Sequence, residues 1–185
     1  MRTLVCAAFA LAFVGGHARA ALAQQQPASL AAWLRGAYME NRSFIAKAAE
    51  QMPEANYGMR PGQQQEVRTF GQLVGHLANF NYLWCAEARG EKNPNAGNNF
   101  EKTTSKAALV KAIDDALAYC DATYASLTDA SGAEPVSAVT EGGRRVQVPR
   151  MSILIQNYGH NQEHYGNIVT YMRIKNIAPP SSTAP

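Results

Sequence analysis

The chain has 185 residues, and its 17 Lys and Arg against 14 Asp and Glu give a formal charge of +3. The length fits a single domain, and 46% hydrophobic residues are typical of a folded chain rather than a disordered one. No apolar run reaches the roughly 18–20 residues of a membrane-spanning helix. A protein that binds nucleic acid by neutralising phosphates would carry a stronger basic excess. We therefore expect one folded domain with neither a membrane span nor a nucleic-acid partner.

Residues 1–23 have the three parts of a secretory signal peptide. A positive start precedes an apolar core at residues 4–14, and small residues then form A-x-A cleavage sites that end at Ala20 and Ala23. We predict cleavage after Ala23, with Ala20 as the alternative site and an uncleaved amphipathic anchor as the other interpretation. Two arginines leave with this segment, so 17 basic residues become 15 against 14 acidic ones. The mature protein is then secreted or periplasmic, in a compartment where a disulfide can persist.

Two helices are predicted in the first half of the mature chain. The first begins after Ser29, a good N-cap residue, and follows one hydrophobic stripe until Pro53 ends it. A polar connection follows. The second helix begins at a capping box formed by Thr69 and Gln72, and Gly90 closes it.

Two more helices are predicted in the second half. Thr103 or Thr104 caps the third, whose apolar stripe follows a loop rich in Asn and Gly. Residues 129–148 form a long connection that holds a short hairpin near its end. The fourth helix has Pro149 in its first turn and runs to about Lys175.

Four long amphipathic helices can share one core, which makes a four-helix bundle the simplest architecture. We therefore predict an all-α domain over residues 24–180, followed by a disordered tail at residues 181–185.

Three histidines remain in the mature chain, each on a predicted inward face. His160 and His164 are four residues apart on the fourth helix, which places both imidazoles on one face, one turn apart. His76 lies on the apolar stripe of the second helix, where a buried imidazole needs a partner for its nitrogens. Any one of these histidines could equally be an ordinary hydrogen-bonded residue. Three together suit a divalent transition metal with open coordination positions. We predict a metal site at His76, His160 and His164, with zinc or nickel favoured over iron, copper or manganese.

The residues around the histidine pair offer further chemistry. The segment HNQEH matches the H-x-x-E-H motif of inverted zincins, but that class needs an acidic ligand downstream and no acidic residue follows His164. Glu163 stands about 60° round the helix from His160, so we expect it to act as a general base, with Tyr171 as a second proton-transfer group; the alternative for Glu163 is a solvated carboxylate. The predicted pocket residues are Gln156, Asn157 and Asn167.

Two segments carry a resemblance to a known family: VRTFGQLVGHLANFNYLW on the second helix and NYGHNQEHYGNIVTYMRIKNIAPP on the fourth. Over about residues 30–180 the chain resembles the DinB-like (YfiT-related) metalloprotein superfamily. The resemblance implies a bundle with up-down-down-up helix order, often dimeric. It also implies a divalent metal bound by one histidine of the second helix and an H-x3-H pair of the fourth, which correspond to His76, His160 and His164.

Characterised members of that family include thiol-dependent transferases and isomerases and some proposed hydrolases. The predicted signal peptide is a departure from the thiol-dependent members, because small thiol cofactors belong to the cytoplasm. We therefore predict a secreted metal-dependent enzyme of hydrolase or transferase type, which acts on a small molecule through a metal-bound water. The alternatives are a metal-binding or sensing module without turnover and a structural bundle that the metal merely staples.

Cys85 and Cys120 are the two cysteines of the mature chain, and they are either buried thiols or a disulfide between the second and third helices. In antiparallel helices they would be separated by about 12 residues, or about 18 Å, which is too far for a disulfide. In parallel helices they stand at the same height, and the 13 residues of 90–102 can span about 43 Å to make the crossover. The parallel arrangement agrees with the helix order that the resemblance implies, so we predict the disulfide.

Overall fold

The structure is a computed structural model that describes residues 29–139 and 142–183. The predicted signal peptide and both of its cleavage sites lie outside this part of the chain. Within the described residues, no helix combines the length and the hydrophobicity that crossing a membrane requires.

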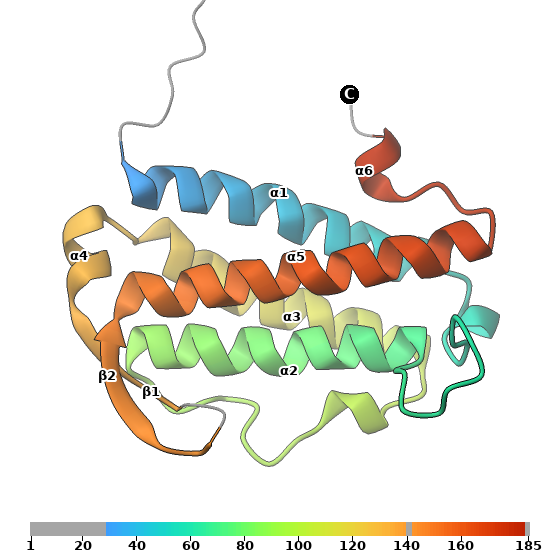
Figure 1. Cartoon of the computed structure of the whole chain (residues 1–185), viewed down its shortest axis with the longest axis horizontal. Coiled ribbons are helices and arrows are strands. Elements are labelled where there is room, and N and C mark those ends of the chain that lie inside the picture. Colours follow the sequence, from blue (N-terminus) through green and yellow to red (C-terminus); the bar gives the residue numbers. More distant parts are fainter. Residues whose placement is uncertain (1–28, 140–141, 184–185) are drawn as a thin grey trace, which may run out of the picture.

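Four long helices lie side by side and form the body of the domain (Figure 1). Each of the four segments with helical periodicity forms one of them, with boundaries within a few residues of the predicted ones: α1 (Leu30–Gln51), α2 (Phe70–Arg89), α3 (Lys106–Ala125) and α5 (Arg150–Ile174). Helix α2 contacts α3 and α5, and α1 contacts the same two helices. The four helices therefore surround a shared interior.

The predicted caps define the starts of the first two helices and the end of α2. The Ser29 hydroxyl accepts the backbone N–H of Ala32 at 3.0 Å. Thr69 and Gln72 form the reciprocal capping box. Gly90 ends α2 with a φ of 69°, in the left-handed region that glycine adopts without steric cost.

The start of α3 differs from the prediction. Ser105 caps the helix, rather than Thr103 or Thr104. The reason is a single 3-10 turn, Phe100–Lys102, which ends at Thr103 and leaves the chain extended until Ser105. This turn lies against α2.

The connection between α3 and α5 holds the predicted hairpin, which is longer than expected, and also a short helix that the sequence does not predict. It contains a short helix, α4 (Asp129–Ala133), and an antiparallel hairpin of β1 (Pro135–Val139) and β2 (Arg145–Pro149), which lie together at one end of the bundle (Figure 1). Pro149 is the last residue of β2 and the N-cap of α5, rather than a residue of its first turn. The all-α prediction is therefore corrected to a mostly helical domain with one two-stranded sheet.

The predicted disordered tail is also wrong for its described part. Residues Pro180–Thr183 form a short helix, α6, that contacts α1. The Tyr165 hydroxyl donates to the Ser181 hydroxyl at 2.9 Å and accepts the backbone N–H of Ser181 at 3.0 Å. A buried tyrosine of α5 thus holds the tail, and hydrophobic periodicity carries no signal for such a contact.

The apolar core consists of two clusters along the bundle. One includes Ile45, Phe70, Leu77, Ile113 and Ile168. The other includes Leu34, Tyr38, Trp84, Tyr124 and Leu154. Polar side chains separate the two clusters along α5, where Asn157, His160, Asn161 and His164 lie, and Asn81 separates them on α2.

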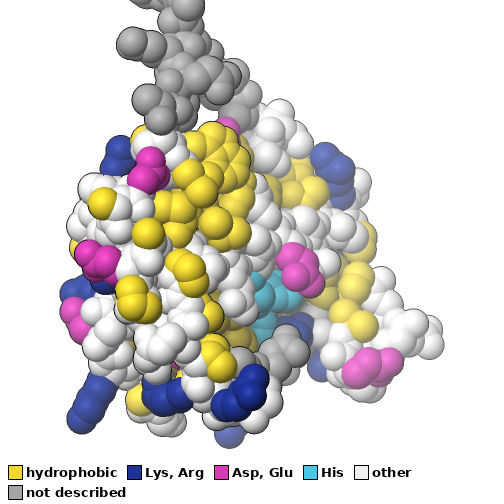
Figure 2. All heavy atoms as spheres, turned by 60° about the vertical axis from the view of Figure 1, so that its left-hand side comes forward, with side chains coloured by type: hydrophobic (Ala, Val, Ile, Leu, Met, Phe, Trp, Pro, Cys, Tyr) yellow, Lys and Arg dark blue, Asp and Glu magenta, His cyan; other side chains and the backbone are white. Residues whose placement is uncertain are grey.

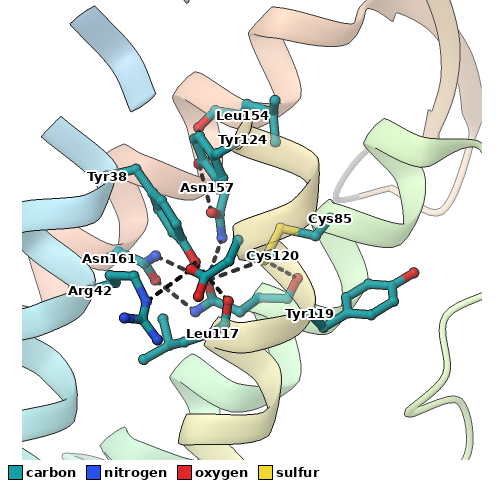
Figure 3. Close-up of a disulfide and its surroundings, with 12 residues drawn as sticks. Tyr38, Arg42, Cys85, Leu117, Tyr119, Cys120, Tyr124, Leu154, Asn157 and Asn161 are labelled. Atoms are coloured by element: carbon teal, nitrogen blue, oxygen red, sulfur yellow. Dashed lines mark hydrogen bonds and ion pairs between the residues drawn. A yellow bond between two sulfur atoms is a disulfide. The ribbon is translucent and has the colours of Figure 1, made fainter. Parts of the chain in front are cut away.

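The predicted disulfide joins Cys85 of α2 to Cys120 of α3, with 5.4 Å between their Cα atoms (Figure 3). Both cysteines are completely buried. Near the beginning of the same two helices, Gly71 lies against Leu109. Because early residues pair with early ones and late residues with late ones, α2 and α3 run in the same direction.

Three buried asparagines form a hydrogen-bonded cluster beside the disulfide (Figure 3). The Asn81 side-chain oxygen accepts from the amides of Asn157 and Asn161 at 3.1 and 3.0 Å, and its own amide donates to the Leu77 carbonyl at 2.8 Å. The Tyr124 hydroxyl donates to the Asn157 side-chain oxygen at 2.8 Å. Asn81 is therefore the centre of a polar network that links α2, α3 and α5.

Asn81→Ala is expected to lower the free energy of unfolding by about 2–3 kcal/mol, because it leaves the amides of Asn157 and Asn161 buried without their acceptor. Chemical denaturation of the variant measures this loss. The exposed Asn98→Ala in the α2–α3 connection is the matched control and should change stability little. Equal stabilities for the two variants would show that the network contributes nothing.

Candidate metal centre

Helices α2 and α5 bring the three predicted histidines together. His76 comes from α2, and His160 and His164 come from successive turns of α5. One ring nitrogen from each lies within 4.8 Å of the others. The Nε2 atoms of His76 and His160 are 3.0 Å apart, close to the roughly 3.4 Å that separates two nitrogens around one tetrahedral ion at 2.1 Å. The three rings thus fit a single small cation.

The electrostatics of the three rings also fit metal binding. Burial, together with the positive charge that His164 and His76 carry when protonated, lowers the pKa of His160 to about 3. Burial is also the main reason that the pKa values of His76 and His164 fall below the ordinary value. All three imidazoles are therefore neutral at neutral pH, which is the form that ligates a metal. Among the described residues, the buried Nδ1 of His160 has no hydrogen-bond partner.

Aromatic rings form one wall of the centre. The rings of Phe80 and Trp84 have centroids 5.0 and 4.7 Å from that of His160. Both residues follow His76 on α2 at helical spacing, so the apolar stripe that defines this helix also shields one side of the histidine cluster. A shielded site lowers the local dielectric and strengthens the binding of a cation to its ligands.

The opposite side of the centre is open. Figure 2 shows histidine side chains at the molecular surface, in a hollow beside an acidic side chain. A pocket of about 350 Å³ includes His164, Glu163, Asn167, Tyr171 and Arg68 in its lining. A small molecule in this pocket would contact His164 directly.

The two residues predicted to act in catalysis, Glu163 and Tyr171, both line this pocket, but their environments differ. The Glu163 side chain is exposed. The Tyr171 hydroxyl donates to the backbone carbonyl of Arg68 at 2.5 Å, and burial raises the pKa of this tyrosine. In this arrangement Glu163 is free to accept a proton, whereas the Tyr171 proton is already engaged.

The three predicted pocket residues are in three different environments. The Asn167 amide nitrogen lies 3.2 Å from Nδ1 of His164 and lines the pocket. Asn157 is fully buried in the asparagine network and does not reach the pocket. Gln156 is exposed on α5 and is not part of the pocket lining. The helical spacing that placed Asn157 and Gln156 near the histidines did not distinguish the pocket side of α5 from its other sides.

Glu101 also belongs to the site, although the sequence does not predict it. Its Oε1 lies 2.7 Å from Nδ1 of His76, and its Oε2 accepts from Nε of Arg68 at 2.9 Å. Burial alone would raise the pKa of Glu101, but the hydrogen bonds from His76 and Arg68 bring it below the ordinary value. Glu101 belongs to the 3-10 turn between α2 and α3, where no periodic pattern indicates which way a side chain points.

The ligand set leaves coordination positions open. Among the described residues, no cysteine, carboxylate or further histidine joins His76, His160 and His164 in a group that could hold an ion. Three protein ligands with a free position are typical of catalytic zinc sites, whereas structural sites are closed by four.

The family model described as the DinB superfamily matches residues 37–168 of the chain. No curated protein matches the sequence. Among solved structures, a DinB-like protein from Bacillus subtilis is similar with a TM-score of 0.60 and 17% identity, over 78% of this chain and 92% of that one. A conserved protein from Enterococcus faecalis is similar with a TM-score of 0.61 and 11% identity, over 81% and 99% of the two chains.

The structure of a mycothiol-dependent maleylpyruvate isomerase is similar with a TM-score of 0.55 and 16% identity, over 75% of this chain. The match spans 60% of the length of that isomerase. At these identities the solved structures establish a shared fold. The family model covers most of the chain, including all three histidines of the cluster, and the chain therefore belongs to the DinB superfamily.

Proposed function

We propose that the protein is a secreted metal-dependent enzyme of hydrolase or transferase type that acts on a small molecule. The observation that carries the proposal is the group of three neutral histidines with no fourth protein ligand among the described residues, one of which, His164, lines a pocket. A divalent ion bound there would lower the pKa of a bound water toward neutrality and so supply a hydroxide nucleophile. We expect zinc or nickel, with iron, copper or manganese as alternatives.

The residues of the chain have distinct parts in this proposal. His76, His160 and His164 would hold the ion. The exposed carboxylate of Glu163 accepts a proton within the pocket. Asn167 lies beside the His164 ring at the edge of the pocket, with its side-chain amide 3.2 Å from Nδ1. Tyr171 ties α5 to the chain segment before α2 and thereby keeps Arg68 at the edge of the pocket.

Two further features belong to the same proposal. A buried Cys85–Cys120 disulfide supports an extracytoplasmic location, because disulfides are rare in reducing compartments. We also propose that the four long helices follow the up-down-down-up order. The parallel course of α2 and α3 supports this order. The isomerase named above depends on a small thiol, and transferase chemistry of this protein would need a co-substrate present outside the cytoplasm.

The test distinguishes an enzyme from a structural bundle in which the metal only holds the helices together. Cobalt-loaded protein should change its visible absorption saturably when azide is added, because an open coordination position accepts the anion. Hydrolysis of activated esters by the zinc-loaded protein should stop when the metal is removed, and Glu163→Gln should slow it without releasing the metal. A cobalt spectrum that azide leaves unchanged would favour the closed structural alternative.

A further inference from the structure

We propose that Glu101 is a positioning residue, through which the α2–α3 connection orients His76 for metal binding. The proposal rests on the metal site proposed above. It adds an element that no histidine motif contains, the 3-10 turn Phe100–Lys102. Carboxylates that accept a hydrogen bond from a metal-binding histidine orient the ring and make it a better ligand.

The contact between Glu101 and His76 determines which ring nitrogen is available. A carboxylate only accepts hydrogen bonds, so Nδ1 of His76, 2.7 Å from Oε1, carries the hydrogen. The other nitrogen, Nε2, is left with its lone pair and faces Nε2 of His160 at 3.0 Å. The His76 side chain is only 8% exposed, so the carboxylate takes the place of water as the partner of Nδ1.

Glu101 is itself held in place on two sides. The guanidinium Nε of Arg68 donates to Oε2 at 2.9 Å, which fixes the carboxylate plane. The Asn79 side-chain oxygen accepts the backbone N–H of Phe100 at 3.1 Å, and the Asn99 side-chain oxygen accepts that of Glu101 at 3.0 Å. Asn79 follows His76 by three residues on α2, so the helix that carries the ligand also fastens the turn that orients it.

Gly75 makes this close approach possible. A Cβ atom at Gly75 would lie 2.5 Å from the carbonyl carbon of Phe100 and 2.8 Å from the backbone nitrogen of Glu101. These are backbone atoms that cannot rotate away, so any side chain at this position displaces the turn. Gly159 precedes His160 in the same way, but a Cβ there meets nothing within 4 Å. The two glycines therefore form a matched pair, each directly before a histidine of the cluster.

A purely structural role for Glu101 makes a different prediction. If the carboxylate only tied the connection to α2, its loss would affect stability but leave metal affinity and the state of the His76 ring unchanged. The test therefore needs the zinc affinity together with a direct observation of that ring.

The experiment uses the full mature chain and zinc, with the affinity measured by chelator competition. Glu101→Ala and Gly75→Ala should each weaken zinc binding by about 10–100-fold. Glu101→Gln should lose less than Glu101→Ala, because its amide oxygen still accepts from Nδ1. Gly159→Ala and Glu91→Gln should bind as wild type, since Glu91 lies in the same connection but pairs with Arg89.

Nitrogen NMR of histidine-labelled, zinc-loaded protein supplies the second readout. The wild type should show a slowly exchanging Nδ1 hydrogen on His76, which Glu101→Ala should lose while the other two rings keep their signals. Gly75→Ala also disturbs packing, so its result alone does not decide the question. The deciding variant is Glu101→Ala, because Glu101 is partly exposed and its loss disturbs packing less.

Two outcomes would overturn the inference, and they are distinguishable. Wild-type affinity and an unchanged His76 signal in Glu101→Ala would refute the positioning role but leave the metal site intact. A wild-type protein that binds neither zinc nor nickel, iron, copper or manganese would refute the proposed function as well.

Discussion

His160→Ala is expected to weaken zinc binding by more than about 100-fold, because loss of an outer partner of a ligand alone costs 10–100-fold. The His76→Ala, His160→Ala double variant should bind no zinc, since one remaining imidazole cannot hold the ion in competition with water. Metal content after dialysis and the affinity from chelator competition measure both effects. Gln156→Ala is the matched control, because this exposed residue lies on α5 outside the pocket lining.

The same variants should remain folded bundles. Two apolar clusters formed by four long helices supply most of the stability, unlike a zinc finger, which unfolds without its metal. Helical circular dichroism should therefore persist in the double variant and in chelated wild type, although the melting temperature falls. Full zinc occupancy in the double variant would contradict the site, and a random-coil spectrum would contradict the independence of the fold.

Replacement of both disulfide cysteines by alanine is expected to lower the free energy of unfolding by about 3–4 kcal/mol. The bridge closes a loop of 35 residues, and in the chain-entropy model a loop of this length restricts the unfolded chain by about that amount. Alanine is the appropriate replacement, because both cysteines are fully buried and a serine would add a polar hydroxyl to the core. Denaturation of the Cys85→Ala, Cys120→Ala variant against the oxidised wild type measures the effect.

Thiol titration provides the control for this prediction. The denatured, unreduced mature protein should expose no free thiol, and reduction should then release two per chain. Two free thiols before reduction would refute the disulfide. Equal stabilities of the oxidised wild type and the double alanine variant would show that the bridge forms but does not restrict the unfolded chain.

Features that depend on local sequence could be predicted. The long helices follow from hydrophobic periodicity, and their caps at Ser29, Thr69 and Gly90 follow from side-chain and backbone chemistry. The pairing of His160 with His164 needs only the helical repeat. His76 was included because it lies on the stripe of its own helix, and the packing of α2 against α5 then brings it to the other two.

Features that depend on contacts between distant, irregular segments could not be predicted. Glu101 reaches His76 because Gly75 lets a 3-10 turn lie against α2, and neither fact has a periodic signature. In the sequence, Asn81 is only a polar residue within an apolar stripe. Its role depends on its hydrogen-bond partners on α5, which the sequence of α2 does not indicate. The place of the tail at the end of the chain predicts disorder, whereas the hydroxyl of Tyr165 on α5 holds Ser181 in place.

Anomalous diffraction tests the central claim most directly. Crystals of the mature protein, purified without a nickel column and supplied with zinc, should show one anomalous peak per chain at about 2.0–2.2 Å from a nitrogen of each of His76, His160 and His164. Diffraction on both sides of the zinc absorption edge identifies the ion. Zinc-supplied crystals with no peak among these histidines, or with zinc bound only elsewhere, would contradict the three-histidine metal centre.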